Sequence, residues 1–170
     1  MLVVSMWTFF GVSIAFFLVT LFIYVTFYNR KTSAATDRFI LQANELKPLV
    51  FENIKLRYWI SRGLKIQTSP NNHCDLYLFD NCLAIVRRQN FVFKVIFAPV
   101  LITSDIEKAK NLFFDYDIYK PKRVHFNQLV KGEIDINITD PIHQYCRIDI
   151  TFKGLTDEQL TQLEKIKTYC

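Results

Sequence analysis

The chain has 170 residues, of which 51% are hydrophobic, and a formal net charge of +5. These averages hide a division, because residues 2–28 contain no charged side chain and the first charge is Arg30. This length allows one membrane-spanning element and one domain of ordinary size, and it excludes a transporter with many spans or a multidomain enzyme.

The first predicted element is a transmembrane helix over residues 2–28. A helix of this length extends about 40 Å at 1.5 Å per residue, and the hydrocarbon core of a bilayer needs only about 20 residues. Trp7 lies near one end and Tyr24 and Tyr28 lie near the other. These three are the predicted interfacial aromatic residues, because amphipathic rings favour the depth of the lipid headgroups.

The charges around this segment predict its orientation. No basic residue precedes it, whereas Arg30, Lys31 and Arg38 follow it, and basic flanks are retained in the cytoplasm. We therefore predict a single-pass protein of the inner (cell) membrane, with its N-terminus outside and its C-terminal domain in the cytoplasm. A cleaved signal peptide fits less well, because the apolar run exceeds the usual 7–15 residues of such peptides.

The four cysteines bear on the same question. They show no metal-ligand spacing, and scattered thiols are typical of a reducing compartment. The alternative is a domain held outside the cytoplasm by a signal anchor, with a role in the cell envelope, in which cysteines could pair. The cysteines are Cys74, Cys82, Cys146 and Cys170.

Basic residues are concentrated just after the predicted span. Residues 29–65 hold eight Lys or Arg and three Asp or Glu, whereas residues 66–170 hold thirteen of each. Each cation near an anionic leaflet gains about 1 kcal/mol. The alternative is that these charges only fix the topology and keep the linker solvated. The residues predicted to contact the membrane surface and its anionic lipids are Arg30, Lys31, Arg38, Lys55, Arg57, Arg62 and Lys65.

A juxtamembrane linker is predicted over residues 29–48, with apolar residues at helical spacing before Pro48. The folded domain is predicted over residues 49–170. Within it apolar and polar residues alternate, as in antiparallel strands that have one face on a core and one in water. The clearest alternation covers residues 53–60, 124–127, 133–139 and 147–152.

Turn residues divide the first half of this domain. A short turn over residues 61–63 is predicted to join two strands, and the run from Ser69 to His73 has loop chemistry. Residues 75–88 are predicted to form a hairpin about Asp80 and Asn81. The aromatic run over residues 91–97 is predicted to be a strand that ends near Pro99.

A helix with a defined start is predicted over residues 156–168 at the end of the chain. Thr156 and Gln159 have the spacing of a capping box, and Leu155 and Leu160 that of a hydrophobic staple. Further apolar residues of this segment recur at helical spacing, so the helix is expected to pack on the strands rather than stand free.

The predicted fold is therefore mainly β with a C-terminal α-helix. About seven strands form a small antiparallel barrel, and the helix covers one open end. The strand order, the hairpin over residues 75–88 and the segment 148–156 before the last helix resemble bacterial pleckstrin-homology-like (PH/GRAM-like) domains. The resemblance covers roughly residues 50–169.

This resemblance implies a seven-strand barrel capped by a helix, and a binding module rather than an enzyme. Eukaryotic members bind phosphoinositides through basic residues around the first hairpin. The spacing here differs from their lysine–arginine signature, so the implied partner is an anionic surface in general. The residues in the corresponding region are Lys55, Arg57, Arg62 and Lys65.

Chemically reactive groups are few and scattered. His73, Cys74 and Asp75 lack the converging spacing of a metal site, and His143 with Cys146 lacks an orienting acid. No glycine-rich phosphate loop occurs, and the balanced charge of the domain offers no footprint for nucleic acid. The sequence therefore predicts no catalytic residue, no metal, no cofactor and no nucleic-acid partner.

The predicted function is a membrane-anchored, non-enzymatic interaction module that binds a protein partner, the anionic membrane surface, or both. Besides the envelope domain, the remaining alternative is a cryptic hydrolase that uses loop carboxylates or His73. The sequence does not indicate the oligomeric state or the identity of the partner.

Overall fold

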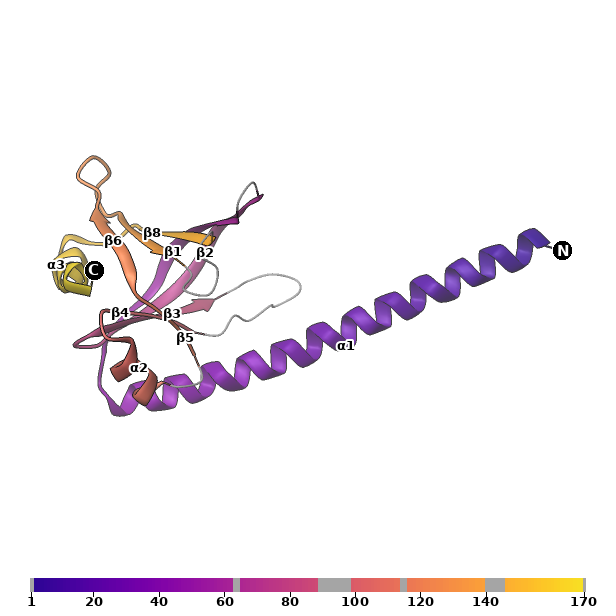
Figure 1. Ribbon diagram of the computed structural model, residues 1–170, viewed down its shortest axis with the longest axis horizontal. Coiled ribbons are helices and arrows are strands. Elements are labelled where there is room, and N and C mark those ends of the chain that lie inside the picture. The colour runs from indigo at the N-terminus through magenta and orange to yellow at the C-terminus, as the bar shows by residue number, and fades with distance from the viewer. Residues whose placement is uncertain (1, 63–64, 89–98, 114–115, 140–145, 170) are drawn as a thin grey trace.

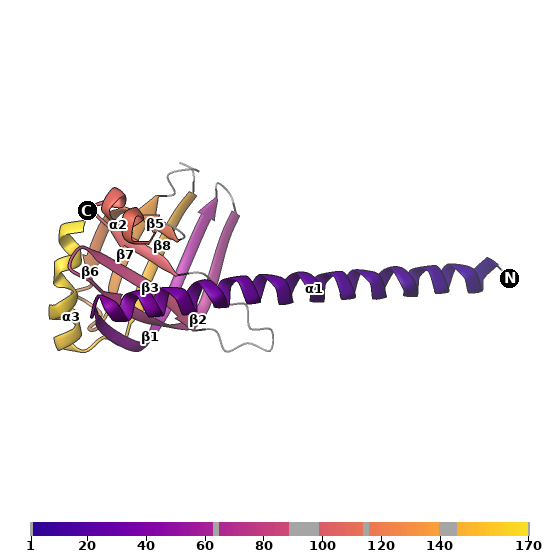
Figure 2. The ribbon, with the colours of Figure 1, turned by 90° about the horizontal axis from the view of Figure 1, so that it is seen from below.

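One eight-stranded sheet, curled into a nearly closed barrel, makes up most of the folded domain, and a long helix projects from it (Figures 1 and 2). The computed structural model describes residues 2–62, 65–88, 99–113, 116–139 and 146–169. In chain order the elements are α1 (Leu2–Glu45), β1 (Leu49–Arg62), β2 (Lys65–Leu78), β3 (Cys82–Arg88), β4 (Val100–Thr103), α2 (Ile106–Leu112), β5 (Asp117–Tyr119), β6 (Pro121–Phe126), β7 (Ile134–Thr139), β8 (Cys146–Lys153), α3 (Asp157–Leu163) and the 3₁₀ helix η1 (Glu164–Tyr169).

The strand order is β5-β4-β3-β2-β1-β8-β7-β6, so β5 and β6 are the two edges. The predicted mainly β fold with a C-terminal helix is confirmed. The prediction of a wholly antiparallel barrel is wrong in one pairing, because β4 and β5 run parallel. Lys120 alone separates β5 from β6 in the chain, and Pro121, which has no N–H to donate, suits the edge strand that follows.

The predicted loop from Ser69 to His73 is instead part of β2, which runs unbroken from Lys65 to Leu78. Two β2 residues, Pro70 and Asn71, lie opposite Arg57 alone, which makes a β-bulge. A bulge tolerates a proline inside a strand because ladder hydrogen bonds are interrupted there. Loop-forming residues therefore mark a bulge here.

A second bulge lies on β1 between Phe51 and Ile54. Asn53 has a φ of 58° there, in the left-handed region that asparagine tolerates better than most residues. The buried carboxylate of Asp75 accepts a hydrogen bond of 2.9 Å from the Asn53 N–H. Asp75, part of the reactive-looking run 73–75, therefore has a structural contact in the sheet.

The first core fills the barrel and follows the predicted alternation. Over residues 54–61 of β1 and along β7 and β8, the inward residues are apolar, and the outward ones are polar or charged except for Trp59. Burial of each large aliphatic side chain contributes about 1.5–3 kcal/mol. The fully enclosed members are Cys74, Leu76, Leu83, Ile85, Ile102, Ile134, Ile136, Ile138, Phe152, Leu163 and Ile166.

The C-terminal helix begins as predicted. The Thr156 hydroxyl accepts from the Gln159 N–H, and the Gln159 side chain accepts from the Thr156 N–H. Ile166 and Tyr169 then insert into the first core. The predicted helix over residues 156–168 is divided, since its second half is the 3₁₀ helix η1. Both helices lie at the end of the barrel away from the N-terminal half of α1 (Figures 1 and 2).

A second core lies outside the barrel, between the sheet and the two helices α1 and α2. Strand β3 is buried on both faces, because Leu83 and Ile85 point inward while Ala84 and Val86 point outward. The outward residues are covered by the C-terminal part of α1. The buried members of the second core are Phe39, Ala43, Tyr77, Cys82, Ala84, Val86, Leu101 and Phe113.

Helix α1 continues well past the predicted end of the span. It runs from Leu2 to Glu45, so nearly all of the predicted linker over residues 29–48 is helical and part of it is packed on the domain. A separate linker between span and domain is therefore absent from these residues. The strand predicted over residues 91–97 lies outside the described residues.

Candidate functional site

Helix α1 has an apolar segment that the domain does not cover. Within the described residues it is the one helix long and apolar enough to cross a membrane, and its most apolar window is not buried at all. Tyr24 and Tyr28 lie at the end of this segment with stacked rings, 6.4 Å between centroids. Their interfacial position stays a prediction, and the side chain of Trp7 is outside the described set.

The next part of α1, residues 32–43, packs on the domain, and we call it the docked segment. Phe39 is fully buried and contacts the rings of Tyr77, Phe79, Phe113 and Tyr116, with centroids 5.4–6.5 Å apart. Aromatic pairs in such arrangements add about 0.5–1.5 kcal/mol each beyond the area that they bury. Phe39 therefore anchors the helix to the second core.

A polar contact also fixes the docked segment. The Tyr116 hydroxyl donates a 3.0 Å hydrogen bond to the Ala35 carbonyl, although these residues lie 81 positions apart in the chain. Thr32 is buried, and its hydroxyl donates to the Tyr28 carbonyl one turn earlier. Because one continuous helix joins the apolar segment to the docked segment, the direction of the former sets the orientation of the domain.

The two ends of the barrel face opposite ways along α1. The end of β1 and the beginning of β2 lie on the side of the barrel toward the N-terminal half of the helix, and α3 lies on the other side (Figures 1 and 2). The β1–β2 hairpin therefore points toward the place where a membrane around the apolar segment would lie.

The predicted lipid-contact residues fall into three places rather than one patch. Those on α1, Arg30, Lys31 and Arg38, are exposed. Lys55 and Arg57 are exposed on the outer face of β1. Because a strand rises about 3.3 Å per residue, they lie roughly 20 Å from the end of β1. The hairpin end is formed by Arg62 and Lys65, which pair in the last rung and whose side chains are outside the described set.

One basic residue of the same end was not among those predicted. Arg147 pairs with Ser61 on one side and with Thr139 on the other, and its side chain is two-thirds exposed. It also forms an exposed ion pair with Asp149 at 3.0 Å. The signal that could have found it is the antiparallel pairing of β8 with β1, which brings the first residues of β8 to the last residues of β1.

Models of known families, curated proteins and solved structures contain no match to this chain. The resemblance to pleckstrin-homology-like domains therefore stays a prediction.

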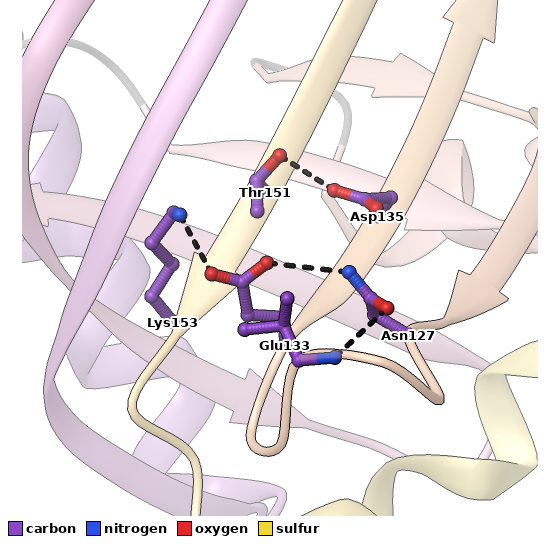
Figure 3. Close-up of polar contacts among 6 residues, drawn as sticks. Asn127, Glu133, Asp135, Thr151 and Lys153 are labelled. Carbon is purple, nitrogen blue, oxygen red and sulfur yellow. Dashed lines mark hydrogen bonds and ion pairs between the residues drawn. The ribbon is translucent and has the colours of Figure 1, made fainter.

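The outer face of β7 and β8 carries a network of charges and hydroxyls (Figure 3). Lys153 contacts Glu133 at 2.6 Å, and Thr151 donates to Asp135 at 2.6 Å. Glu133 also accepts from the Asn127 side chain, which holds the β6–β7 turn (Figure 3). Lys153 neutralises Glu133 and Asp135 accepts from a hydroxyl, so these contacts link neighbouring strands and stabilise their pairing.

The two cysteines whose side chains the structure describes, Cys74 and Cys82, are buried. Cys74 lies in the first core and Cys82 in the second, on opposite faces of the sheet. Burial raises the pKa of each thiol to about 12, and for Cys74 the neighbouring Asp75 carboxylate adds to the effect. A nucleophilic cysteine needs a lowered pKa and access, so neither thiol is activated.

Metal ligands do not converge in the part of the chain that the structure describes. No group of three or more His, Cys, Asp or Glu residues there could hold a metal ion. The described part of the chain does not include residues 140–145, among them His143. Arg87 is half-buried, and its guanidinium lies 4.6 Å over the Tyr58 ring of the first core. Burial lowers the pKa of its guanidinium.

Proposed function

We propose that this chain is a single-pass, membrane-anchored interaction module. Its pleckstrin-homology-like barrel is held on the cytoplasmic face of the inner membrane, where it meets the anionic lipid surface and presents its remaining faces to a protein partner. The single observation that carries the proposal is the rigid connection of the apolar segment of α1 to the barrel through the docked segment.

The charges agree with this placement. Arg30 and Lys31 follow the apolar segment directly, and the hairpin end of the barrel adds Arg62, Lys65 and Arg147. Each basic residue close to an anionic leaflet contributes about 1 kcal/mol, and the contribution falls off within a Debye length. Lys55 and Arg57 lie farther along the strand and are expected to contribute less.

The orientation is tested with protease on intact spheroplasts that carry the full chain. The domain is expected to be protected, and to be digested only after the inner membrane is opened. Digestion in intact spheroplasts would contradict the cytoplasmic placement and favour the extracytoplasmic envelope domain.

The contact with lipid is tested by fluorescence quenching in the full chain, reconstituted in nanodiscs. A fluorophore is placed at the hairpin end in Ser61→Cys, and in a matched control at the opposite side in Gln128→Cys, with Cys146 and Cys170 replaced by Ser. Buried Cys74 and Cys82 should remain unlabelled. Headgroup-attached quenchers are expected to quench the Ser61 site more strongly than the Gln128 site. Equal quenching would contradict the proposed orientation.

The role of charge is tested by comparing two double variants in the same assay. Arg62→Glu with Lys65→Glu is expected to weaken quenching at residue 61 on anionic nanodiscs, and added salt should do the same to the wild type. Lys110→Glu with Lys131→Glu changes charge equally at exposed positions and should have little effect. Identical behaviour of both double variants would remove the electrostatic contribution from the proposal.

A further inference from the structure

A cavity of about 380 Å³ lies where α1 ends, next to the β2–β3 turn, α2 and η1. It is separate from the hairpin end of the barrel and from the charged network on β7 and β8. Its walls include Leu78, Phe79 and Phe113, which belong to or adjoin the two cores. Small-molecule sites are commonly apolar cavities of about 300–1,000 Å³ with a few polar groups at the rim.

Part of the rim that meets solvent is apolar. Leu46, Leu49 and Leu112 line the cavity and each leaves more than 40% of its surface exposed. Contiguous exposed apolar residues around a concave surface are typical of a binding site. An isolated exposed leucine, such as Leu129 on the β6–β7 turn, lines none of the described cavities.

Three lysines give the cavity a positive potential. Lys47, Lys108 and Lys165 line it from the α1–β1 connection, α2 and η1, and none forms an ion pair with another described residue. Asp80 is the one carboxylate among the lining residues. The excess of positive charge therefore favours an anionic group beside the apolar walls.

The backbone supports a functional role for Lys47. Its φ is 48°, in the left-handed region that glycine or asparagine usually occupies just after a helix. A lysine in this conformation costs about 1 kcal/mol relative to glycine. Residues kept in strained conformations cluster at binding and catalytic sites.

We infer that this cavity binds a small anionic amphiphile, namely a medium-chain carboxylate of the fatty-acid type. The chain of the ligand would lie on the leucines and phenylalanines, and its carboxylate would meet the lysines at the rim. A partly open cavity of about 380 Å³ has room for one small molecule of this kind. The inference does not depend on the membrane orientation proposed above.

The experiment measures equilibrium binding of radiolabelled decanoate to the full chain in nanodiscs of zwitterionic lipid, with empty nanodiscs subtracted. Saturable binding of one decanoate per chain is expected. Decanol has the alkyl chain without the charge, and acetate has the charge without the alkyl chain. Each should therefore compete with labelled decanoate at least about tenfold more weakly than unlabelled decanoate does. Equal competition by decanol would contradict the role of the lysines.

Paired variants locate the site. Lys108→Glu is expected to weaken decanoate binding at least about tenfold, whereas Lys110→Glu, on the same helix but outside the cavity, should not. Leu112→Ser should weaken binding and Leu129→Ser should not, although both leucines are exposed. Circular dichroism checks that each variant is folded.

Three results would overturn the inference: no saturable binding above empty nanodiscs, equal effects of the members of each pair, or capture of an acidic apolar peptide without any binding of decanoate. The last result would assign the cavity to a macromolecular partner. Because the quenching assay of the hairpin does not involve this cavity, failure here leaves the proposed function intact and can be distinguished from it.

Discussion

At the scale of single residues, two glycines with similar backbone angles have unequal roles. Gly132 and Gly154 have φ values of 80° and 74°. A Cβ on Gly132 would lie 2.7 Å from the Leu155 carbonyl oxygen, whereas one on Gly154 would meet nothing within 4 Å. Close packing between the β6–β7 turn and the start of α3 therefore requires Gly132 for space as well as for conformation.

We expect Gly132→Ala to lower the free energy of unfolding by more than 2 kcal/mol, and Gly154→Ala by about 1 kcal/mol. Both substitutions incur the strain of a left-handed alanine, and only the first adds a clash with backbone. Chemical denaturation followed by circular dichroism measures the difference. Equal losses would show that the turn moves away from Leu155 without cost.

The two buried thiols predict how stability depends on pH. Burial raises the pKa of Cys74 and Cys82 from 9.0 to about 12, so above pH 9 they ionise in the unfolded chain before they do so in the folded one. The contribution of the two thiols to the free energy of unfolding is fully present below pH 9 and is lost as the pH rises from 9 toward 12. The loss is about 1.4 kcal/mol for each thiol and each pH unit.

This prediction is tested with Cys74→Ala and Cys82→Ala combined. The double variant is less stable at pH 8 because small cavities form, but its stability should fall less steeply between pH 9 and 11 than that of the wild type. Urea denaturation at a series of pH values gives both slopes. Parallel slopes would mean that other groups cause the alkaline loss.

At the scale of elements, local signals in the sequence were sufficient for some segments. The capping box at Thr156 and Gln159 involves residues three apart, so it could be predicted without the fold. The alternation over residues 133–139 likewise matches β7, whose inward isoleucines are fully buried. In both cases the relevant interactions lie within a few residues along the chain.

Other elements depend on partners far away in the chain. Proline and asparagine after Ser69 predicted a loop, but the opposite strand accommodates them as a bulge. The docking of α1 could have been predicted in part, because the unbroken apolar run over residues 82–86 is typical of a strand buried on both faces. Nothing local identifies α1 as the element that covers it.

The cavity was missed for the same reason. Its lysines come from the α1–β1 connection, α2 and η1, and Lys47 and Lys165 are more than a hundred residues apart in the chain. Each alone has the surroundings of an ordinary surface lysine. Their proximity to one set of apolar walls follows from the packing of the helices around the barrel.

The docked segment leads to a prediction about one side chain. Phe39→Ala removes a fully buried ring from between four others, and it should lower the free energy of unfolding by about 3–5 kcal/mol. Leu41→Ala, two residues along the same helix but exposed, should change it by less than about 0.5 kcal/mol. Denaturant unfolding of the full chain in nanodiscs measures both, and similar losses would contradict the packing of α1.

At the scale of the whole molecule, the helix and the barrel form one folded unit. Residues 29–170 keep the docked segment, and a chain that begins at Leu46 lacks it. We expect the longer fragment to be soluble with cooperative unfolding. The shorter one should aggregate or lose cooperativity, because the outward faces of Tyr77, Ala84 and Leu101 become exposed.

Size-exclusion chromatography and thermal unfolding of the two fragments test this expectation. Equal solubility and equal unfolding temperatures would show that the barrel is complete without α1. In that case the contacts of Phe39 would orient the helix without stabilising the domain.

The unbroken run of α1 from the apolar segment into the docked segment has a consequence for lateral encounters within a bilayer. An α-helix turns about 100° and rises about 1.5 Å with each residue. One residue inserted near Arg30 would therefore swing the barrel around the helix axis by more than a quarter of a turn, while seven would return it to within about 20°. The number of helical residues between the apolar segment and the docked segment therefore sets the rotation of the domain about the helix axis. This rotation determines which side of the domain faces neighbours in the same membrane.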